Sequence, residues 1–324
     1  MFREIAITDI PGLRVGHAQD AEAGTGCTVL ICEAGAVAGV DVRGGAPATR
    51  ETDLLNPVNL VERIHAVVLS GGSAFGLDAA SGVMACLEER GVGFNVQVAR
   101  VPIVCGASLF DLPVGDPRVR PDRAMGYAAC QNAVAEPPAQ GSVGAGTGAS
   151  VGKLCGMERA MKGGFGHYGL ECGALRVASA VAVNCLGDVL DPDTGSVLAG
   201  LLDEGRQTVL DTELEMCRRY ADTGNLFAGN TTIGVVVTNG RLSKPQAAKA
   251  ASMAHDGFAR AMRPAHSMWD GDTIFVLATG EVEVDVNVVG ILGAQTMARA
   301  IANAVMYAEP AYGLPAARDL PKTA

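Results

Sequence analysis

The run GNTTIGVVVTN at residues 229–239 predicts a β-strand that begins at Thr231, because threonine, valine and isoleucine favour strands. The polar, glycine-rich segment YADTGNLFAGN at 220–230 predicts an exposed or strained connection into that strand. Composition and apolar spacing beyond the strand predict a helix, a second strand and a second helix, at 245–262, 272–278 and 288–307. The end of the chain therefore predicts a β-α-β-α unit.

Upstream of this unit, short apolar runs at 27–32 and 66–69 predict buried strands. A helix is expected directly after the second run, with Ser73 as its N-cap and Gly91 at its end. The run around Pro102 is expected to be an edge strand or irregular, because proline cannot donate a hydrogen bond within a central strand. A Pro/Gly/Ser-rich loop is expected at 136–152, strands around Asn184 within 174–190, and a helix at 208–220.

The composition bounds the class of protein. Of the 324 residues, 48% are hydrophobic and only 4% aromatic, which is enough to bury a large core of small aliphatic side chains. No repeat with a fixed short period divides the chain, so we expect a single domain over residues 1–324. The formal charge of −10 disfavours nucleic acid and anionic membranes as partners and favours a small-molecule substrate.

Cysteine usage and hydropathy predict a cellular location. Nine cysteines are scattered through apolar stretches, with no CxxC pair and no His/Cys cluster at zinc spacing. They predict reduced thiols and no metal site. The chain begins MFREI, with an acidic residue, and no later run approaches the ~20 uninterrupted apolar residues of a membrane span. We therefore expect a soluble cytoplasmic protein.

Thr231, at the start of its strand and behind a polar connection, is a candidate nucleophile. Its hydroxyl can turn onto the carbonyl of the preceding residue, and cleavage there would leave an α-amino group beside the hydroxyl. The reference pKa of such an amino group, about 7.7 to 8.0, suits a general base near neutral pH. Two threonines opening a strand are also ordinary β-propensity, so the hypothesis needs partner residues.

Asp270 and Asp272 flank Gly271 just before the second strand of the unit. Carboxylates spaced i, i+2 at such a junction project toward the same side, and the glycine allows another chain to approach closely. The pair can orient a hydroxyl, hold an ammonium group, or split its two pKa values so that one member accepts a proton. A solvated Asp-Gly turn is the structural alternative.

Lys153 ends the glycine-rich loop. The loop is not a P-loop, because Thr147 and Leu154 occupy positions that require glycine and Ser or Thr. It is not a dinucleotide fingerprint either, because no apolar strand precedes it and no acidic residue follows about 20 positions later. The lysine is either a solvated surface residue or a cation beside a nucleophile, where it would stabilise an oxyanion.

Asn184 lies inside the apolar run VASAVAVNCLG, so its amide needs hydrogen-bond partners. Its NH2 group is either an oxyanion donor or a structural amide bonded to the backbone. The five histidines form no metal-binding pattern, and His255 and His266, which flank the end of a predicted helix, are expected to be structural.

Six motifs together resemble one family. In chain order they are TDIPGLRVGH, LSGGSAFGLDAASGV, LFDLPVGD, GASVGKLCG, GNTTIGVVVTN and DGDTIFVLATG. The set, which spans nearly the whole chain, resembles the L-aminopeptidase D-amidase/esterases, the β-aminopeptidases and the nylon-oligomer hydrolase. The resemblance implies an α+β fold, a four-layer αββα sandwich similar to the N-terminal-nucleophile hydrolases, and a precursor that cleaves itself.

The resemblance also implies roles for residues. Asn230–Thr231 is the implied scissile bond and Thr231 the implied nucleophile. Asp270 and Asp272 are implied to orient and activate the threonine. Lys153 is implied to lie beside it, and Asn184 to donate to the oxyanion.

Substrate binding is assigned by the same resemblance to Phe110, Gly72 and Ser73. Phe110 departs from the family, whose members carry a tyrosine there, so this chain lacks one polar contact near the substrate carbonyl. The family also implies a homo-oligomer, with a tetramer suggested, and neither a metal nor an organic cofactor.

The leading hypothesis is a self-processing amidase or peptidase with an α fragment of residues 1–230 and a β fragment of residues 231–324. It acts on small amide, peptide or ester substrates through an acyl-enzyme. Two alternatives stay open: acyl transfer to an amine, as in the ornithine acetyltransferases, and a catalytically silent small-molecule binding protein.

Overall fold

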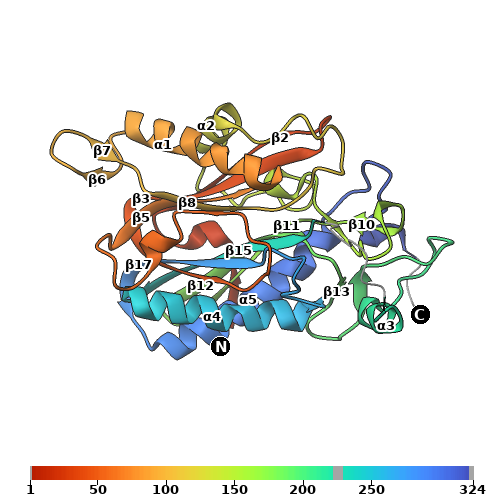
Figure 1. The fold of residues 1–324 in the computed structure, drawn as a ribbon. Helices are drawn as coiled ribbons and strands as arrows, with labels where there is room; N and C mark the ends of the chain where they lie inside the picture. Colours follow the sequence, from red (N-terminus) through yellow and green to blue (C-terminus); the bar gives the residue numbers. More distant parts are fainter. Residues whose placement is uncertain (1, 222–228, 321–324) are drawn as a thin grey trace.

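The computed structural model describes residues 2–221 and 229–320 (Figure 1). Its helices are α1 (Ala79–Glu89), α2 (Arg123–Gln131), α3 (Thr212–Arg218), α4 (Lys244–Ala261) and α5 (Val286–Met306). The main sheet has ten strands: β1 (Phe2–Ile5), β2 (Leu13–Asp20), β3 (Thr25–Val42), β4 (Thr49–Arg50), β5 (Arg63–Ser70), β8 (Val104–Ser108), β11 (Gly164–Cys172), β12 (Leu175–Asn184), β15 (Thr231–Arg241) and β17 (Thr273–Glu283). Smaller sheets contain β6 (Phe94–Asn95), β7 (Arg100–Val101), β9 (Ser150–Val151), β10 (Met161–Lys162), β13 (Asp188–Leu190), β14 (Val197–Ala199) and β16 (Met262–Arg263).

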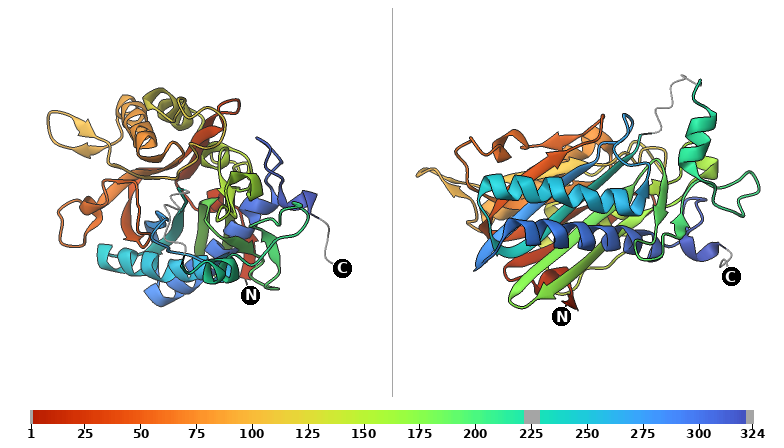
Figure 2. Two further views of the ribbon diagram at one scale, coloured as in Figure 1. Left: turned by 45° about the vertical axis from the view of Figure 1, so that its right-hand side comes forward. Right: turned by 90° about the horizontal axis from the view of Figure 1, so that it is seen from below.

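The long strand β3 joins two layers of the main sheet. Its first half pairs with β2 and β5, and its second half pairs with β17, with an irregularity in the β5 ladder between Ile31 and Ala36. The first layer therefore runs β1-β11-β12-β15-β17, and the second layer contains β2, β5, β8 and β4. Helices α1 and α2 cover one outer face, and α4 and α5 lie side by side along the other (Figures 1 and 2). The expected α+β architecture of four αββα layers is confirmed.

Side-chain alternation fills the three largest hydrophobic cores among the described residues. In β15, Ile233, Val235 and Val237 face the core between the two sheet layers. Val236, on the other side of the same strand, packs in the core beneath α4 and α5. A third core lies between the second layer and α1 and α2, where Val29 is one of the buried residues. Because side chains alternate along β15 and a core lies on each side of it, the apolar run from Thr231 onward is buried on both faces.

Helix α5 is long and apolar enough to cross a membrane by length and composition alone. Over an 18-residue stretch of this helix the mean hydropathy is 1.3, and 72% of that stretch is buried inside the protein. It packs against α4 and the first sheet layer, as a core helix does.

Several expected elements are confirmed with shifted ends, and one cap is wrong. Ser73 does not cap a helix: it is the first residue of a 3-10 turn at Ser73–Asp78, and α1 starts only at Ala79. The chain is already turned there by left-handed backbone at Gly72 and Ser73, with φ of 78° and 56°. Helix α3 is shorter than expected because Asp211 caps it by accepting a hydrogen bond from the Leu214 N–H.

The connection into β15 lies largely outside the described residues, which omit 222–228. At its beginning Tyr220 is 87% exposed, as expected, whereas Asn230 at its end is buried. Gly229 has left-handed backbone with φ of 51°, which suits the glycine found there.

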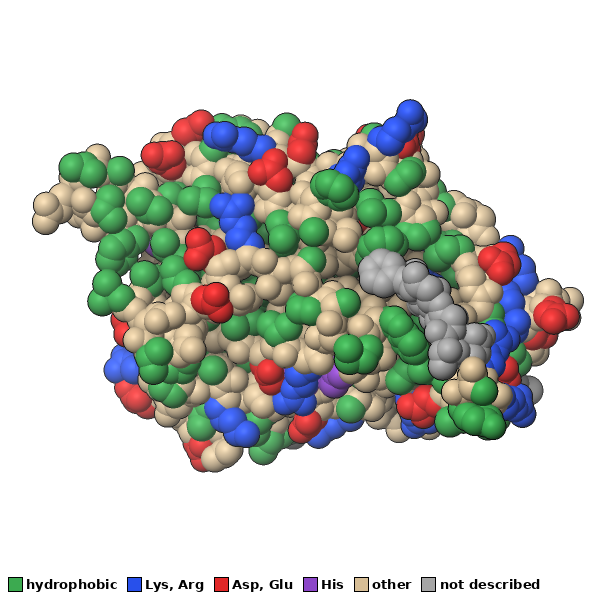
Figure 3. Space-filling model, in the orientation of Figure 1, with side chains coloured by type: hydrophobic (Ala, Val, Ile, Leu, Met, Phe, Trp, Pro, Cys, Tyr) green, Lys and Arg blue, Asp and Glu red, His purple; other side chains and the backbone are tan. Residues whose placement is uncertain are grey.

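On the face shown in Figure 3, acidic and basic side chains are intermixed, and hydrophobic side chains cover the segment that projects at the left. Figure 1 places the β6–β7 hairpin in that segment. Val98, between its two strands, is 94% exposed.

Candidate active site

The pairing of three strands brings the candidate residues to one end of the first sheet layer. Strands β15 and β17 are parallel, with Ile233 opposite Thr273, so the segments that precede both strands start from the same edge. The antiparallel neighbour β12 ends there too, with Asn184 opposite Thr231. The five implied catalytic residues are all buried, with relative exposures of 3% or less: Lys153, Asn184, Thr231, Asp270 and Asp272.

The Thr231 hydroxyl lies against the peptide bond that precedes it. It donates a hydrogen bond to the carbonyl oxygen of Asn230 and accepts one from the Gly271 N–H at 3.1 Å. A Cβ at position 271 would lie 2.7 Å from Thr231 Oγ1, so the glycine permits this approach. Thr232 turns to the other face, where its Oγ1 contacts Met262 Sδ at 3.4 Å. The two threonine side chains therefore lie on opposite faces of β15.

The two carboxylates have different surroundings. Both oxygens of Asp272 have partners: its Oδ1 accepts from the Thr232 N–H at 2.9 Å, and its Oδ2 accepts from the His266 backbone N–H at 2.9 Å and lies 2.9 Å from His266 Nδ1. Asp270 Oδ2 accepts from Ser267 N at 3.3 Å and from Ser267 Oγ. Asp270 Oδ1 is buried and has no hydrogen-bond partner among the described residues. The pair is therefore not a solvated Asp-Gly turn.

Burial raises the pKa of Asp270 to about 6, and the charge of Asp272 adds to this rise. Hydrogen bonds from Ser267 and the nearby Lys153 cation act in the opposite direction. Such a carboxyl group can exchange a proton near neutral pH, which a solvated aspartate cannot do.

Lys153 and Asn184 form one buried cluster. Lys153 Nζ donates to Asn184 Oδ1 at 2.8 Å and to the Asn184 carbonyl at 3.0 Å, and it lies 3.5 Å from the Gly229 carbonyl oxygen. Burial lowers the pKa of Lys153 to about 7, against the opposing charges of Cys185, Asp270 and Asp111. The structure thus excludes the surface-lysine alternative.

Asn184 binds on both sides of its amide. Its Oδ1 also accepts from the Ser150 N–H at 3.0 Å, and its Nδ2 donates to the Phe110 carbonyl oxygen at 3.0 Å. The NH2 group that was a candidate oxyanion donor is therefore bonded to backbone here, which is the structural alternative, and has one further hydrogen available.

Of the three residues assigned to substrate binding, Phe110 contacts Gly229 beside this cluster, whereas Gly72 and Ser73 contact the neighbours of Phe110. The Phe110 ring packs on Gly229, where an added Cβ would lie 2.0 Å from Phe110 Cδ1. Gly72 and Ser73 lie one step further away: Gly72 N–H donates to Asp111 Oδ1 at 2.7 Å, and Ser73 N–H donates to the Leu109 carbonyl at 2.8 Å. These two hydrogen bonds hold Leu109 and Asp111, the residues on either side of Phe110.

Sequence reasoning missed two members of the network. His266, expected to be only structural, binds Asp272, and Ser267 binds Asp270. The one local signal is spacing, since a serine three residues before an aspartate can close a short turn onto its side chain. Nothing in the sequence indicated that the histidine ring would reach the second aspartate.

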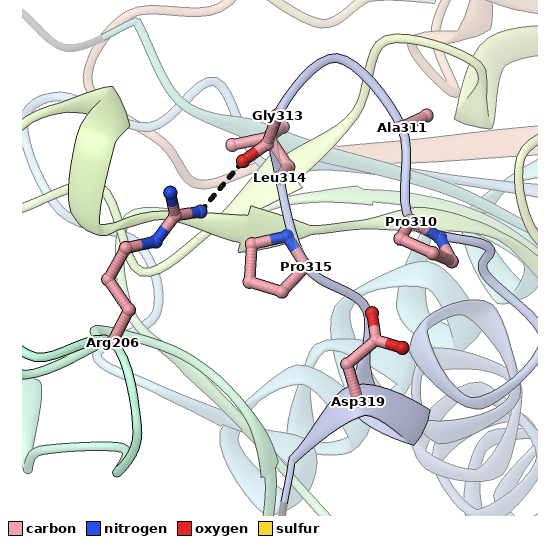
Figure 4. A pocket seen from close by; sticks show the side chains of 7 residues that line it. All are labelled: Arg206, Pro310, Ala311, Gly313, Leu314, Pro315 and Asp319. Atoms are coloured by element: carbon pink, nitrogen blue, oxygen red, sulfur yellow. Dashed lines mark hydrogen bonds between the residues drawn. The ribbon is translucent and has the colours of Figure 1, made fainter.

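A separate pocket of about 420 Å³ lies near the end of the chain (Figure 4). There the Arg206 guanidinium donates to the Gly313 carbonyl at 2.7 Å, beside prolines and Asp319. None of the residues that line it is a candidate catalytic residue.

Known proteins resemble this chain in sequence and in fold. The model of "Peptidase family S58" matches residues 6–317. An uncharacterized aminopeptidase of Mycobacterium tuberculosis (strain ATCC 25618 / H37Rv) is 41% identical over 350 residues, covering 97% of each chain. The 6-aminohexanoate-oligomer endohydrolase of Agromyces sp. (strain KY5R) is 34% identical over 286 residues, covering 87% of this chain and 77% of the relative.

Solved structures show the same fold at low sequence identity. The L-aminopeptidase D-Ala-esterase/amidase of Ochrobactrum anthropi, described as a variant of the Ntn hydrolase fold, has a TM-score of 0.70 at 18% identity. The match covers 94% of this chain and 86% of that one. A Burkholderia sp. β-aminopeptidase has a TM-score of 0.64 at 21% identity over the same shares. The fold is thus of the Ntn hydrolase type, and on the match over residues 6–317 the chain belongs to peptidase family S58.

Proposed function

We propose that the chain is a precursor that cleaves its own Asn230–Thr231 bond and then hydrolyses small amide, peptide or ester substrates with the freed Thr231. The observation that carries the proposal is the placement of the buried Thr231 hydroxyl against the Asn230 carbonyl. The Gly271 N–H donates a hydrogen bond to the oxygen of this hydroxyl. The names of the relatives, aminopeptidases and an oligomer endohydrolase, support amide hydrolysis as the reaction class.

Self-cleavage needs two steps. In the first, Thr231 Oγ1 attacks the Asn230 carbonyl carbon, the C–N bond breaks, and an ester to the threonine oxygen forms while the nitrogen gains a proton. In the second, water hydrolyses the ester, so that Asn230 ends in a carboxylate and Thr231 carries a free amine. Asp270 supports the proton transfers, because its Oδ1 has no other partner among the described residues and its pKa is raised to about 6.

Substrate hydrolysis repeats the same chemistry on an external carbonyl. The α-amino group of Thr231 takes the hydroxyl proton, the oxygen attacks, and the amine or alcohol leaves with a proton. Lys153 supplies positive charge next to the Asn184 amide, on the side of the site that now holds the Gly229 carbonyl. An oxyanion is stabilised by donors placed before the reaction begins, and these two residues fit that role.

Three variants test the proposal by intact mass and by the amino-terminal sequence of the smaller fragment. Thr231→Ala should remain a chain of 324 residues without hydrolysis, whereas Thr231→Ser should still yield fragments of 230 and 94 residues. Thr232→Ala is the matched control and should cleave at the wild-type bond, since its hydroxyl faces Met262. Cleavage that persists in Thr231→Ala, or a fragment that starts at residue 232, would refute the mechanism.

The same preparation separates the alternatives. Release of product from a chromogenic amide in water, unchanged by added ornithine, favours hydrolysis over acyl transfer. A wild-type chain that stays intact and turns over no amide would indicate a binding protein. Size-exclusion chromatography with light scattering tests the homo-oligomer, which remains a prediction.

A further inference from the structure

His266 has an unusual backbone. Its φ is 61°, in the left-handed region that residues other than glycine rarely adopt. Strained backbone of this kind persists where several contacts hold it in place. Here the backbone N–H and the ring Nδ1 both reach Asp272 Oδ2, each at 2.9 Å, so one residue supplies two donors to a single carboxylate oxygen.

The ring of His266 is held from the opposite side by helix α4. It stacks on Phe258 with centroids 5.8 Å apart and meets the His255 ring edge-on at 4.7 Å. His255 is itself anchored, with Nε2 at 3.0 Å from the Asp41 carbonyl oxygen. The imidazole therefore has little freedom to rotate away from Asp272.

Asp272 connects this ring to the nucleophile. An ionised carboxylate can only accept, so the contact requires a hydrogen on His266 Nδ1. The other oxygen of Asp272 accepts from the N–H of Thr232, the residue next to Thr231. A continuous path of hydrogen bonds thus runs from His266 through Asp272 to the backbone that carries the attacking hydroxyl.

We propose that His266 is a positioning residue for Thr231, acting through Asp272 by the hydrogen on its Nδ1. This inference rests on the proposed function, because it assigns His266 to the reaction that Thr231 performs. Without the Nδ1 donor, Asp272 keeps only the hydrogen bonds from two backbone N–H groups, one on each oxygen, and its side chain is held less firmly. The acceptor at the start of β15 is then less precisely placed. Misplacement of a reacting group by ~1 Å can cost on the order of 100-fold in rate.

The test compares three substitutions at this position. His266→Asn places an amide NH2 where Nδ1 stood and tolerates left-handed backbone, so it should process itself within about threefold of the wild-type rate. His266→Gln places its NH2 near the Nε2 position, and His266→Leu has no donor. Both should slow processing by about 10- to 100-fold. In the processed enzymes, kcat should fall in these two variants while KM stays unchanged.

Several outcomes would overturn the inference. Wild-type processing and kcat in His266→Leu would show that the ring only packs, and so would His266→Asn being as slow as His266→Gln. Should the leucine variant fail to fold, the comparison of asparagine with glutamine decides alone. Failure of the proposed function looks different: then the wild type stays intact, or Thr231→Ala is cleaved, whatever residue stands at 266.

Discussion

Replacing Asp270 with asparagine should abolish most of the hydrolysis and, at the same time, change how the fold responds to pH. The side chain keeps its shape and loses its charge. In the wild type this carboxyl is buried beside Asp272, and its pKa is raised from 3.8 to about 6. Charge at this position is therefore unfavourable to the fold, although the proposed mechanism requires it.

The magnitude follows from the shift in pKa. A carboxyl pKa raised from 3.8 to about 6 corresponds to about 3 kcal/mol against the ionised form in the folded state. Between about pH 4 and pH 6 the folded protein retains a proton that the unfolded chain has released, so the free energy of unfolding falls as the pH rises through this window. The free energy of unfolding of the asparagine variant does not fall in this way, because residue 270 then has no carboxyl group to ionise. The stability of the variant relative to wild type should therefore increase by about 2 kcal/mol from pH 4 to pH 7.5, because the unfolded carboxyl has already lost part of its proton at pH 4.

The asparagine variant should also lose some stability that does not depend on pH. The new NH2 group takes the place of Oδ1, which has no partner among the described residues, and an unpaired buried donor costs about 1–3 kcal/mol at every pH. The decisive quantity is thus the difference between the two pH values, not the stability at one of them.

Urea denaturation at pH 4 and pH 7.5, followed by far-UV circular dichroism, measures this difference. Every protein should also carry Thr231→Ala, so that all chains compared are unprocessed. Asp272→Asn is the control: it turns an amide toward donors that now bind a carboxylate, so it should lower stability at both pH values. A stability difference between Asp270→Asn and its parent that does not change with pH would refute the reasoning, as would wild-type turnover in the processed variant.

Three further predictions concern neighbouring residues. Lys153→Met should slow processing and turnover by about 100-fold, because the oxyanion loses its cation; rates equal to wild type in an intact-mass time course would exclude this role. Gly229→Ala should block processing, since its Cβ would lie 2.0 Å from Phe110, and adding Phe110→Ala should restore part of the rate; no recovery in the double variant would point to backbone strain alone. Lys162→Met should lower the free energy of unfolding by about 2 kcal/mol or more, because three buried carbonyls lose their donor; an unchanged urea midpoint would contradict this.

Strong periodicity made part of the fold predictable. The β-α-β-α unit after residue 230 is present, with ends shifted by a few residues, because its strands and helices are long and patterned. Strand β3 was recognised only at 27–32, whereas it extends from Thr25 to Val42. Its second half is poor in large apolar residues because helix α4 approaches closely: a Cβ at Gly39 would lie 2.2 Å from the Ala248 backbone nitrogen.

The candidate site was predictable as a set of residues but not as a set of roles. Spacing and resemblance named Asp270 and Asp272 as a pair, yet only the fold shows that both oxygens of Asp272 have donors, whereas Asp270 Oδ1 has none among the described residues. That difference depends on His266 and Ser267, whose side chains are placed by the turn before β17 and by α4. Contacts of this kind come from tertiary packing, which no local pattern encodes.

The position of the proposed cleavage within the sheet explains how the enzyme could survive it. Strand β15 lies between β12 and β17, and β17 in turn lies between β15 and β3, so strands of the 231–324 fragment are paired on both sides with strands of the 1–230 fragment. Ile233, Val235 and Val237 are buried in the core between the sheet layers. Because the break comes before the first residue of β15, it leaves the ladder from Thr231 onward in place. The new amine is thus held where the peptide nitrogen was, and the two fragments should unfold together in a single transition.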